Sequence, residues 1–73
     1  MRSVYVEMSD ETACEDMGID PEEASMEAVA WHKGTTRREI EFETWEDFVM
    51  PDGYEFLEEE DSEEYHEWKE ANQ

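Results

Sequence analysis

Apolar and polar residues alternate at two places in the chain, which is the pattern of a strand with one buried face. Near the start, Val4, Val6 and Met8 alternate with Tyr5 and Glu7. This alternation predicts a short strand close to the first residue of the chain.

The second alternating segment covers residues 38–43. One side of it is formed by Arg38, Ile40 and Phe42, and the other side is wholly acidic, with Glu39, Glu41 and Glu43. Because successive side chains of a strand point to opposite faces, we expect a half-buried strand whose carboxylates point to solvent.

Helix start and stop signals lie between the two strands. Ser9 can cap a helix over residues 10–17, and Gly18 suits the left-handed conformation that ends many helices. A second start signal follows, with Asp20 as the cap and Pro21 at the first helical position.

Glu23 stands where a capping box places a carboxylate, so the second helix is expected from Pro21 to Lys33, with Gly34 ending it. Residues 28–33 also alternate between two sets of side chains. They are therefore either the end of this helix or a strand that pairs with the next one across a turn at Gly34.

The last third of the chain begins after the second strand, where Thr44 can cap a brief helical turn. Residues 51–53, Pro-Asp-Gly, are a strong turn signal. Residues 54–57 are either a third strand or the entry to the last helix, and helix formers dominate from there on, so an acidic C-terminal helix is expected over residues 58–71.

These elements predict an α+β fold with a small antiparallel sheet of two or three short strands, short helices and the acidic C-terminal helix, in one domain over residues 1–73. Leu57 is the only leucine, so aromatic residues must supply most of the core. We expect Trp45 and Phe48 in that core. Tyr65 and Trp68 either hold the last helix onto the core or form an exposed interface; the first alternative is favoured, because no other residue of that helix could attach it.

Charge changes this picture more than any motif does. The chain has 24 acidic residues against five lysines and arginines, a formal net charge of −19. The field is uneven: residues 9–34 carry −7 and residues 51–73 carry −9, whereas residues 35–50 carry −3. Such self-repulsion opposes folding, which indicates that the charge serves a function. It also argues against direct nucleic-acid binding, since phosphates would be repelled and Arg37 with Arg38 is a very small basic patch.

The most distinctive feature is a run of eight acids on the predicted last helix: Glu58, Glu59, Glu60, Asp61, Glu63, Glu64, Glu67 and Glu70. At about 1.5 Å rise per residue they give about one charge per 2.4 Å of helix axis, against one per roughly 1.7 Å for duplex DNA. Together with Glu39, Glu41 and Glu43 on the strand face, these residues are the candidate partner-binding site, with Tyr65 and Trp68 as candidate anchors inside it.

In size, charge and interspersed aromatics, the chain resembles the small acidic inhibitors of bacteriophages and mobile elements that imitate DNA, such as anti-CRISPR and anti-restriction proteins. This class has no common motif, so no residues can be carried over. The resemblance implies a stoichiometric, non-catalytic inhibitor of a basic nucleic-acid-binding host protein or host defence complex, acting in the cytoplasm of the host cell.

Two other interpretations stay open. The chain could be a protein-interaction module or transcription-type regulator that uses Trp31, Trp45 or Trp68 as an anchor, with acidity serving solubility. Halophilic adaptation is the third hypothesis, although the preference for Glu over Asp gives it no particular support. A homodimer is compatible with each of them.

Chemistry-bearing motifs are weak. His66 is flanked by Glu63 and Glu70 at helical spacing, but a zinc site normally needs four ligands, so we expect no metal and no cofactor. Cys14 lies among acidic residues that disfavour a thiolate, and no nucleophile–base pair or phosphate-binding loop is present, so we expect no enzyme. The sequence contains no apolar run of membrane length, which predicts a cytoplasmic protein without membrane contact.

Overall fold

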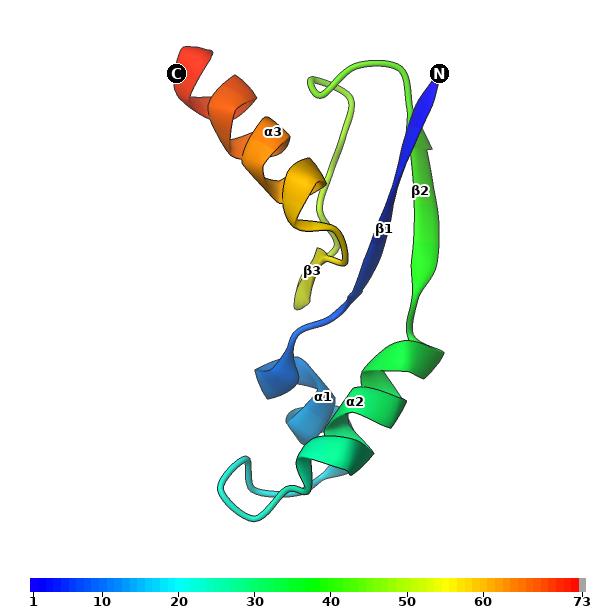
Figure 1. The fold of residues 1–73 in the computed structure, drawn as a ribbon, viewed down its shortest axis with the longest axis vertical. Coiled ribbons are helices and arrows are strands. Elements are labelled where there is room, and N and C mark those ends of the chain that lie inside the picture. The colour runs from blue at the N-terminus through cyan, green and yellow to red at the C-terminus, as the bar shows by residue number, and fades with distance from the viewer. Residues whose placement is uncertain (73) are drawn as a thin grey trace.

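The computed structural model describes residues 1–72 and shows an α+β fold, as predicted (Figure 1). Three strands form one antiparallel sheet in the order β2-β1-β3. Along the chain the elements are β1 (Arg2–Met8), α1 (Asp10–Met17), α2 (Met26–Thr35), β2 (Arg38–Phe42), β3 (Tyr54–Phe56) and α3 (Glu59–Ala71). Of the expected domain, Gln73 lies outside the described residues.

The sheet is built around the first strand of the chain. β1 pairs with β2 along Arg2–Val6 and with β3 along Val6–Met8, and the amide of Leu57 extends this pairing by donating to the carbonyl of Tyr5 at 2.9 Å. Val4 and Val6 are fully buried on one face. The alternation therefore gave the correct buried face for Val4, Val6 and Phe42, although Glu7, which it placed on the other face of β1, is also buried.

An aromatic cluster covers that buried face. Phe42, Trp45 and Phe48 are buried there, with ring centroids 4.7 to 5.4 Å apart. Trp45 and Phe48 come from the predicted turn after β2, in which the amide of Asp47 donates to the carbonyl of Thr44. Few aliphatic residues are available in this chain, so these rings supply most of the apolar area between the sheet and α3.

α1 and α2 form a separate, smaller core at one end of the sheet (Figure 1). Ala13, Cys14 and Val29 are buried between the two helices. α1 has the predicted bounds, because the Ser9 hydroxyl accepts from the amide of Thr12 and Gly18 adopts φ 72°. The molecule is elongated as a result, with extents of 40 × 23 × 18 Å.

The predicted start of the second helix is wrong. Asp20 does accept hydrogen bonds from residues 22–24, but these close only a turn, and α2 begins at Met26 behind Ser25, whose hydroxyl accepts from the amide of Ala28. A second capping residue thus competes with Asp20 and provides the actual cap. Residues 28–33 are helical, and the helix continues through Gly34 to Thr35.

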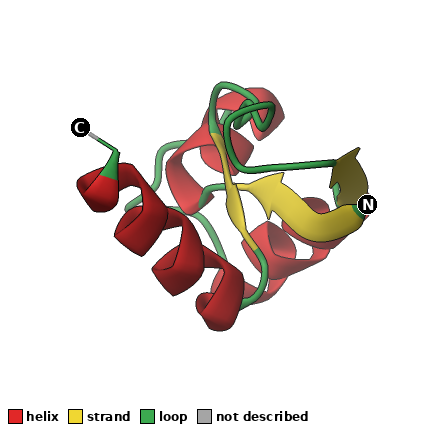
Figure 2. Ribbon diagram, turned by 90° about the horizontal axis from the view of Figure 1, so that it is seen from above, coloured by secondary structure: helices red, strands yellow, loops and turns green. Residues whose placement is uncertain are grey.

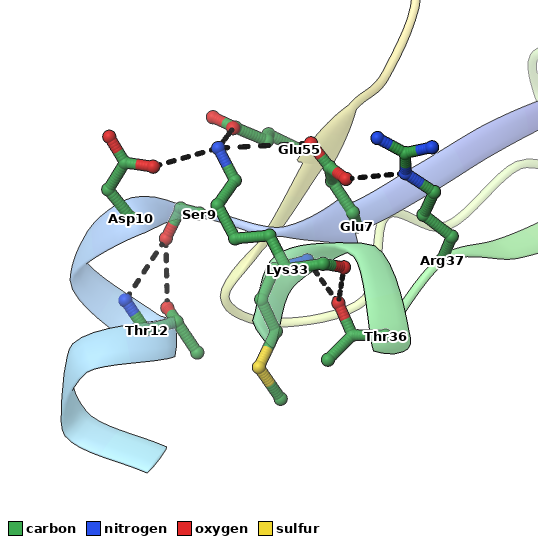
Figure 3. A network of polar contacts seen from close by, with 9 residues as sticks. Glu7, Ser9, Asp10, Thr12, Lys33, Thr36, Arg37 and Glu55 are labelled. Atoms are coloured by element: carbon green, nitrogen blue, oxygen red, sulfur yellow. Dashed lines mark hydrogen bonds and ion pairs between the residues drawn. The ribbon is translucent and has the colours of Figure 1, made fainter. Parts of the chain in front are cut away.

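Lys33 joins the α1–α2 pair to the sheet through a network of polar contacts (Figure 3). Its ammonium nitrogen lies 2.7 Å from Asp10 of α1, 3.2 Å from Glu55 of β3 and 3.8 Å from Glu7 of β1. The other oxygen of Glu7 accepts from Arg37 at 2.9 Å. The hydrogen bond with Asp10 raises the pKa of Lys33 above its ordinary value, so the lysine is charged throughout the neutral range.

Replacing Lys33 with methionine should lower the free energy of unfolding by about 2 kcal/mol, because Asp10 and Glu55 then lose this cation and the buried Glu7 keeps only Arg37. Urea denaturation at pH 7 measures the change. Lys69→Met is the matched control: it removes the same charge from an exposed lysine that has no ion pair within residues 1–72, and its effect should stay under about 0.5 kcal/mol. Equal losses in the two variants would contradict the role of Lys33.

Candidate acidic binding surface

All five basic residues are engaged inside the molecule. Arg2, Lys33 and Arg37 make ion pairs with carboxylates. The guanidinium of Arg38 lies 4.8 Å from the ring centre of Tyr54, and the ammonium of Lys69 lies 5.9 Å from that of Tyr65. These contacts leave most of the carboxylates without a cation of this chain beside them, so their charge is presented to solvent and to any partner.

The outer side of α3 carries an ordered row of carboxylates. Glu59, Glu63, Glu67 and Glu70 follow one another at intervals of four, four and three residues, which places them on one helix face, and all four are exposed. Side chains at this spacing stand about 5 to 6 Å apart at their β-carbons. We call these four residues the α3 stripe.

The inner side of α3 attaches the helix to the core. Tyr65 and Trp68 are half-buried and pack against the aromatic cluster, with the Tyr65 ring 5.4 Å from that of Trp45. Their placement follows the favoured alternative from the sequence, in which these residues hold the helix down. Seen from above, α3 runs along one side of the molecule, away from the N-terminus (Figure 2).

Glu64 also faces inward, although it belongs to the acidic run. Its two oxygens accept from both terminal nitrogens of Arg2 at 2.6 Å, and the indole of Trp45 donates to one of them at 3.5 Å. The guanidinium of Arg2 lies 4.6 Å above the Trp45 ring. The hydrogen bonds from Arg2 lower the pKa of Glu64, and its charge is neutralised locally, so Glu64 adds little to the outer field.

The remaining members of the run surround the first turn of α3. Glu58 is the residue before the helix, and it makes no side-chain capping bond. Glu60 is exposed and lies next to the α3 stripe on the helix surface, whereas Asp61 is half-buried on the inner side. Of the eight predicted carboxylates, the four of the α3 stripe and Glu60 form the continuous outward surface.

The glutamates of β2 face a different direction. Ile40 and Phe42 point to the core that α3 covers, so Glu39 and Glu41, which alternate with them, lie on the opposite face of the sheet. On that face Glu39 accepts from the hydroxyl of Ser3 at 2.9 Å. Glu43 follows the strand and is exposed. The structure therefore separates the predicted site into two acidic surfaces rather than one.

The three tryptophans have very different environments. Trp45 is buried and Trp68 is packed against the core, but Trp31 of α2 is 73% exposed. The sequence predicted Trp45 in the core and favoured Trp68 as a contact between the last helix and the core, whereas it gave no environment for Trp31, although each of the three was also named as a possible anchor. The environment of each depends on which helix face the tertiary structure covers.

Other chemistry is weakly represented. Within residues 1–72 no group of histidine, cysteine and carboxylate side chains is arranged to hold a metal ion, so His66 is not joined by Glu63 and Glu70 in such a group. His32 instead contacts Asp16 at 2.7 Å, and Cys14 is buried. No helix in the described part of the chain has the length and apolar character needed to cross a membrane.

In comparisons with known proteins, no family model matches this chain, and no curated protein or solved structure matches it significantly.

The pKa shift of Glu64 gives a prediction about pH. A carboxylate whose folded-state pKa is lowered adds stability above its ordinary pKa of 4.5, and that stability is lost as pH falls through the lower folded value. Glu64→Gln should therefore destabilise the protein at pH 7, and the difference from the unmodified chain should shrink steadily below about pH 4.5. Urea midpoints from pH 7 to pH 3 test this.

Glu67→Gln is the control, because it removes one exposed charge from the same helix without touching Arg2. It should be neutral or slightly stabilising at pH 7, since it reduces repulsion. A destabilisation by Glu64→Gln that stays constant over the whole pH range would show that the charge of Glu64 is not what Arg2 recognises.

Proposed function

We propose that this chain is a DNA-mimic inhibitor of the phage type, which occupies the basic nucleic-acid-binding site of a host defence complex or other host DNA-binding protein in the cytoplasm, without catalysis. The observation that carries the proposal is the α3 stripe: four exposed carboxylates in a row on a helix whose opposite side is fixed to the core. The engagement of every basic residue inside the molecule supports it further.

Rigidity favours a mimic over a solubilising tail. A frayed acidic tail would pay conformational entropy when it is ordered on a partner. α3 is held in advance by Tyr65, Trp68 and the Arg2–Glu64 pair, so its carboxylates are already in place. Pre-organised carboxylates give tighter binding, because less of the interaction free energy is lost in ordering the helix on its partner.

The charge density of the stripe is lower than that of a DNA strand. From Glu59 to Glu70 the helix rises by 11 steps of about 1.5 Å, or roughly 17 Å. The stripe therefore has one charge per about 5 to 6 Å, against one per 3.4 Å along a single DNA strand. A basic groove that binds the α3 stripe would therefore meet a row of negative charges, but fewer of them per unit length than on a DNA strand. Glu60 beside the stripe adds to the density at its first turn.

Electrostatic attraction dominates such a complex. A strongly negative field speeds the encounter with a basic surface, and the acceleration falls with ionic strength because added salt screens it. Occupation of the groove would exclude DNA sterically, so inhibition would need one inhibitor per site. The second acidic surface on β2 faces away from α3, so a groove that takes one of the two leaves the other exposed.

The test uses the proteins that the tagged chain retains from a bacterial lysate at low salt and that duplex DNA then elutes. With such a protein, changing Glu59, Glu63, Glu67 and Glu70 together to glutamine should slow association at least tenfold at 50 mM salt and flatten the dependence of log affinity on log salt. Stopped-flow or surface-plasmon measurements give both quantities.

The matched control changes four exposed acids outside the α3 stripe, Glu15, Glu22, Glu23 and Asp52, to the corresponding amides, and so has the same net charge. It should slow association much less, since only the overall field is reduced. The proposal fails if both variants have the same effect, or if no retained protein is eluted by DNA.

A further inference from the structure

α2 has an outer face that is unusual for this chain. In a sequence with 40% charged residues, its ten residues Met26–Thr35 include only Glu27 and Lys33 as charged groups, and Lys33 is used in the ion-pair cluster. Val29 faces α1, and the exposed side carries Ala28, Ala30 and Trp31 with Glu27 as its one charged residue. An exposed helix side with so little charge is typical of a surface that has a partner.

Two large side chains on this helix lie in solvent. Trp31 is 73% exposed and Met26 is 89% exposed. Tryptophan is the residue most enriched at the energetic centres of protein interfaces, and methionine adapts its shape to a partner surface. Neither residue contributes to the aromatic core, so the fold itself gives no reason for their apolar character.

Two hollows flank α2. One is a groove of about 630 Å³ between α1 and α2, on the side of Met26 and Ala30, with Cys14, Ala24 and Val29 in its apolar lining. Trp31 lines the other, of about 430 Å³, together with Met17 and Ala28. Asp10 and Glu11 lie at the acidic edge of the groove. Met26 also lines the groove while remaining largely in solvent, so the groove is an open surface feature and suits side chains of a macromolecule more than an enclosed small ligand.

The charge around the groove decides which partner fits. Residues 9–34 carry eight acids against Lys33 alone, and that lysine is already paired with Asp10. A second copy of this chain would bring another −19 to the same place, and a nucleic acid or an anionic membrane would also be repelled. Apolar side chains surrounded by lysine and arginine would find both burial and attraction.

We propose that the outer face of α2 and the adjoining groove, through Trp31, Met26 and Ala30, bind a basic amphipathic helix of a partner protein. The apolar face of that helix would lie across the outer side of α2, covering Trp31 and reaching Ala30 and Met26 at the edge of the groove, as amphipathic helices do on apolar surfaces. Its basic face would lie against the exposed carboxylates of Glu11 and Glu27.

This surface is independent of the α3 stripe. α1 and α2 lie at one end of the elongated molecule, and α3 extends towards the other end (Figure 1). The inference therefore does not require that the chain imitates DNA, and it stands or falls separately.

The test uses a synthetic helical peptide with leucine on one face and lysine on the other, and a scrambled peptide of the same composition. The three tryptophan indole signals are followed in ¹⁵N spectra, and the signal that Trp31→Phe removes is assigned to Trp31. At 150 mM salt the amphipathic peptide should shift the Trp31 signal and amides of α1 and α2. Trp31→Ala should weaken its binding at least tenfold, and the scrambled peptide should bind at least tenfold more weakly.

Val49→Ala is the matched control, since Val49 is 77% exposed and lies in the loop before β3; it should leave binding unchanged. Ala30→Arg keeps Trp31 in place and puts a positive charge beside the groove, so it should also weaken binding at least tenfold. Because both Trp31 and Ala30 are exposed, thermal unfolding should be nearly the same in these variants and the unmodified chain.

Several results would overturn the inference. Charge alone would be shown to attract the peptide by any of three results. These are peptide-induced shifts confined to α3, peptide binding by Trp31→Ala as tight as by the unmodified chain, or binding of the scrambled peptide as tight as that of the amphipathic one. A Trp31-dependent dimer in sedimentation velocity would assign the face to a second copy. Shifts of the Trp31 signal by vesicles of zwitterionic phosphatidylcholine would assign it to lipid. Loss of DNA-competed binding in the α3-stripe variant would bear only on the proposed function.

Discussion

The ammonium group of Lys33 lies within 4 Å of carboxylates from α1, β1 and β3, and the arrangement of the whole molecule depends on this contact. The sheet and the α1–α2 pair have separate cores, connected through two chain segments at Met8–Ser9 and Thr36–Arg37. Backbone hydrogen bonds such as Ser9 to Gly53, at 3.0 Å, align the junction. In the absence of Lys33, the carboxylates of Asp10, Glu55 and Glu7 would converge at this junction with only Arg37 beside Glu7, and repulsion would weaken the joint.

The same constraint explains where the other cations lie. A chain of net charge −19 can fold only if its few basic residues reduce repulsion where the backbone brings acids together. Arg2 joins β1 to α3 through Glu64, and Arg37 shares Glu7 with Lys33. These cations stabilise contacts between elements distant in sequence. Most of the other carboxylates are exposed, so the outer surface is strongly negative, although Arg37, Arg38 and Lys69 are exposed as well.

Local signals were sufficient for much of this fold. Alternation identified β1 and β2 with their buried faces, and Ser9 with Gly18 fixed both ends of α1. The start of α2 was missed because Asp20 and Ser25 are both competent caps. Which of the two begins the helix depends on how α2 packs against α1. For the candidate site, the acidic helix was predictable from composition. The inward turn of Glu64 and the separation of α3 from Glu39 and Glu41 were not, because both depend on which sheet face α3 covers.

A purely electrostatic surface has a limitation that bears on the two proposed contacts. Carboxylates at roughly regular spacing attract any basic groove, so they increase association rates without strongly selecting one partner. Selection comes from shape and desolvation around a few large side chains. On this molecule those side chains are at the end opposite to α3, where Met26 is exposed at the edge of a groove and Trp31 is exposed beside a smaller hollow. If one target contacts both ends, the acidic helix would set how fast it binds, and the apolar face of α2 would set which protein it is.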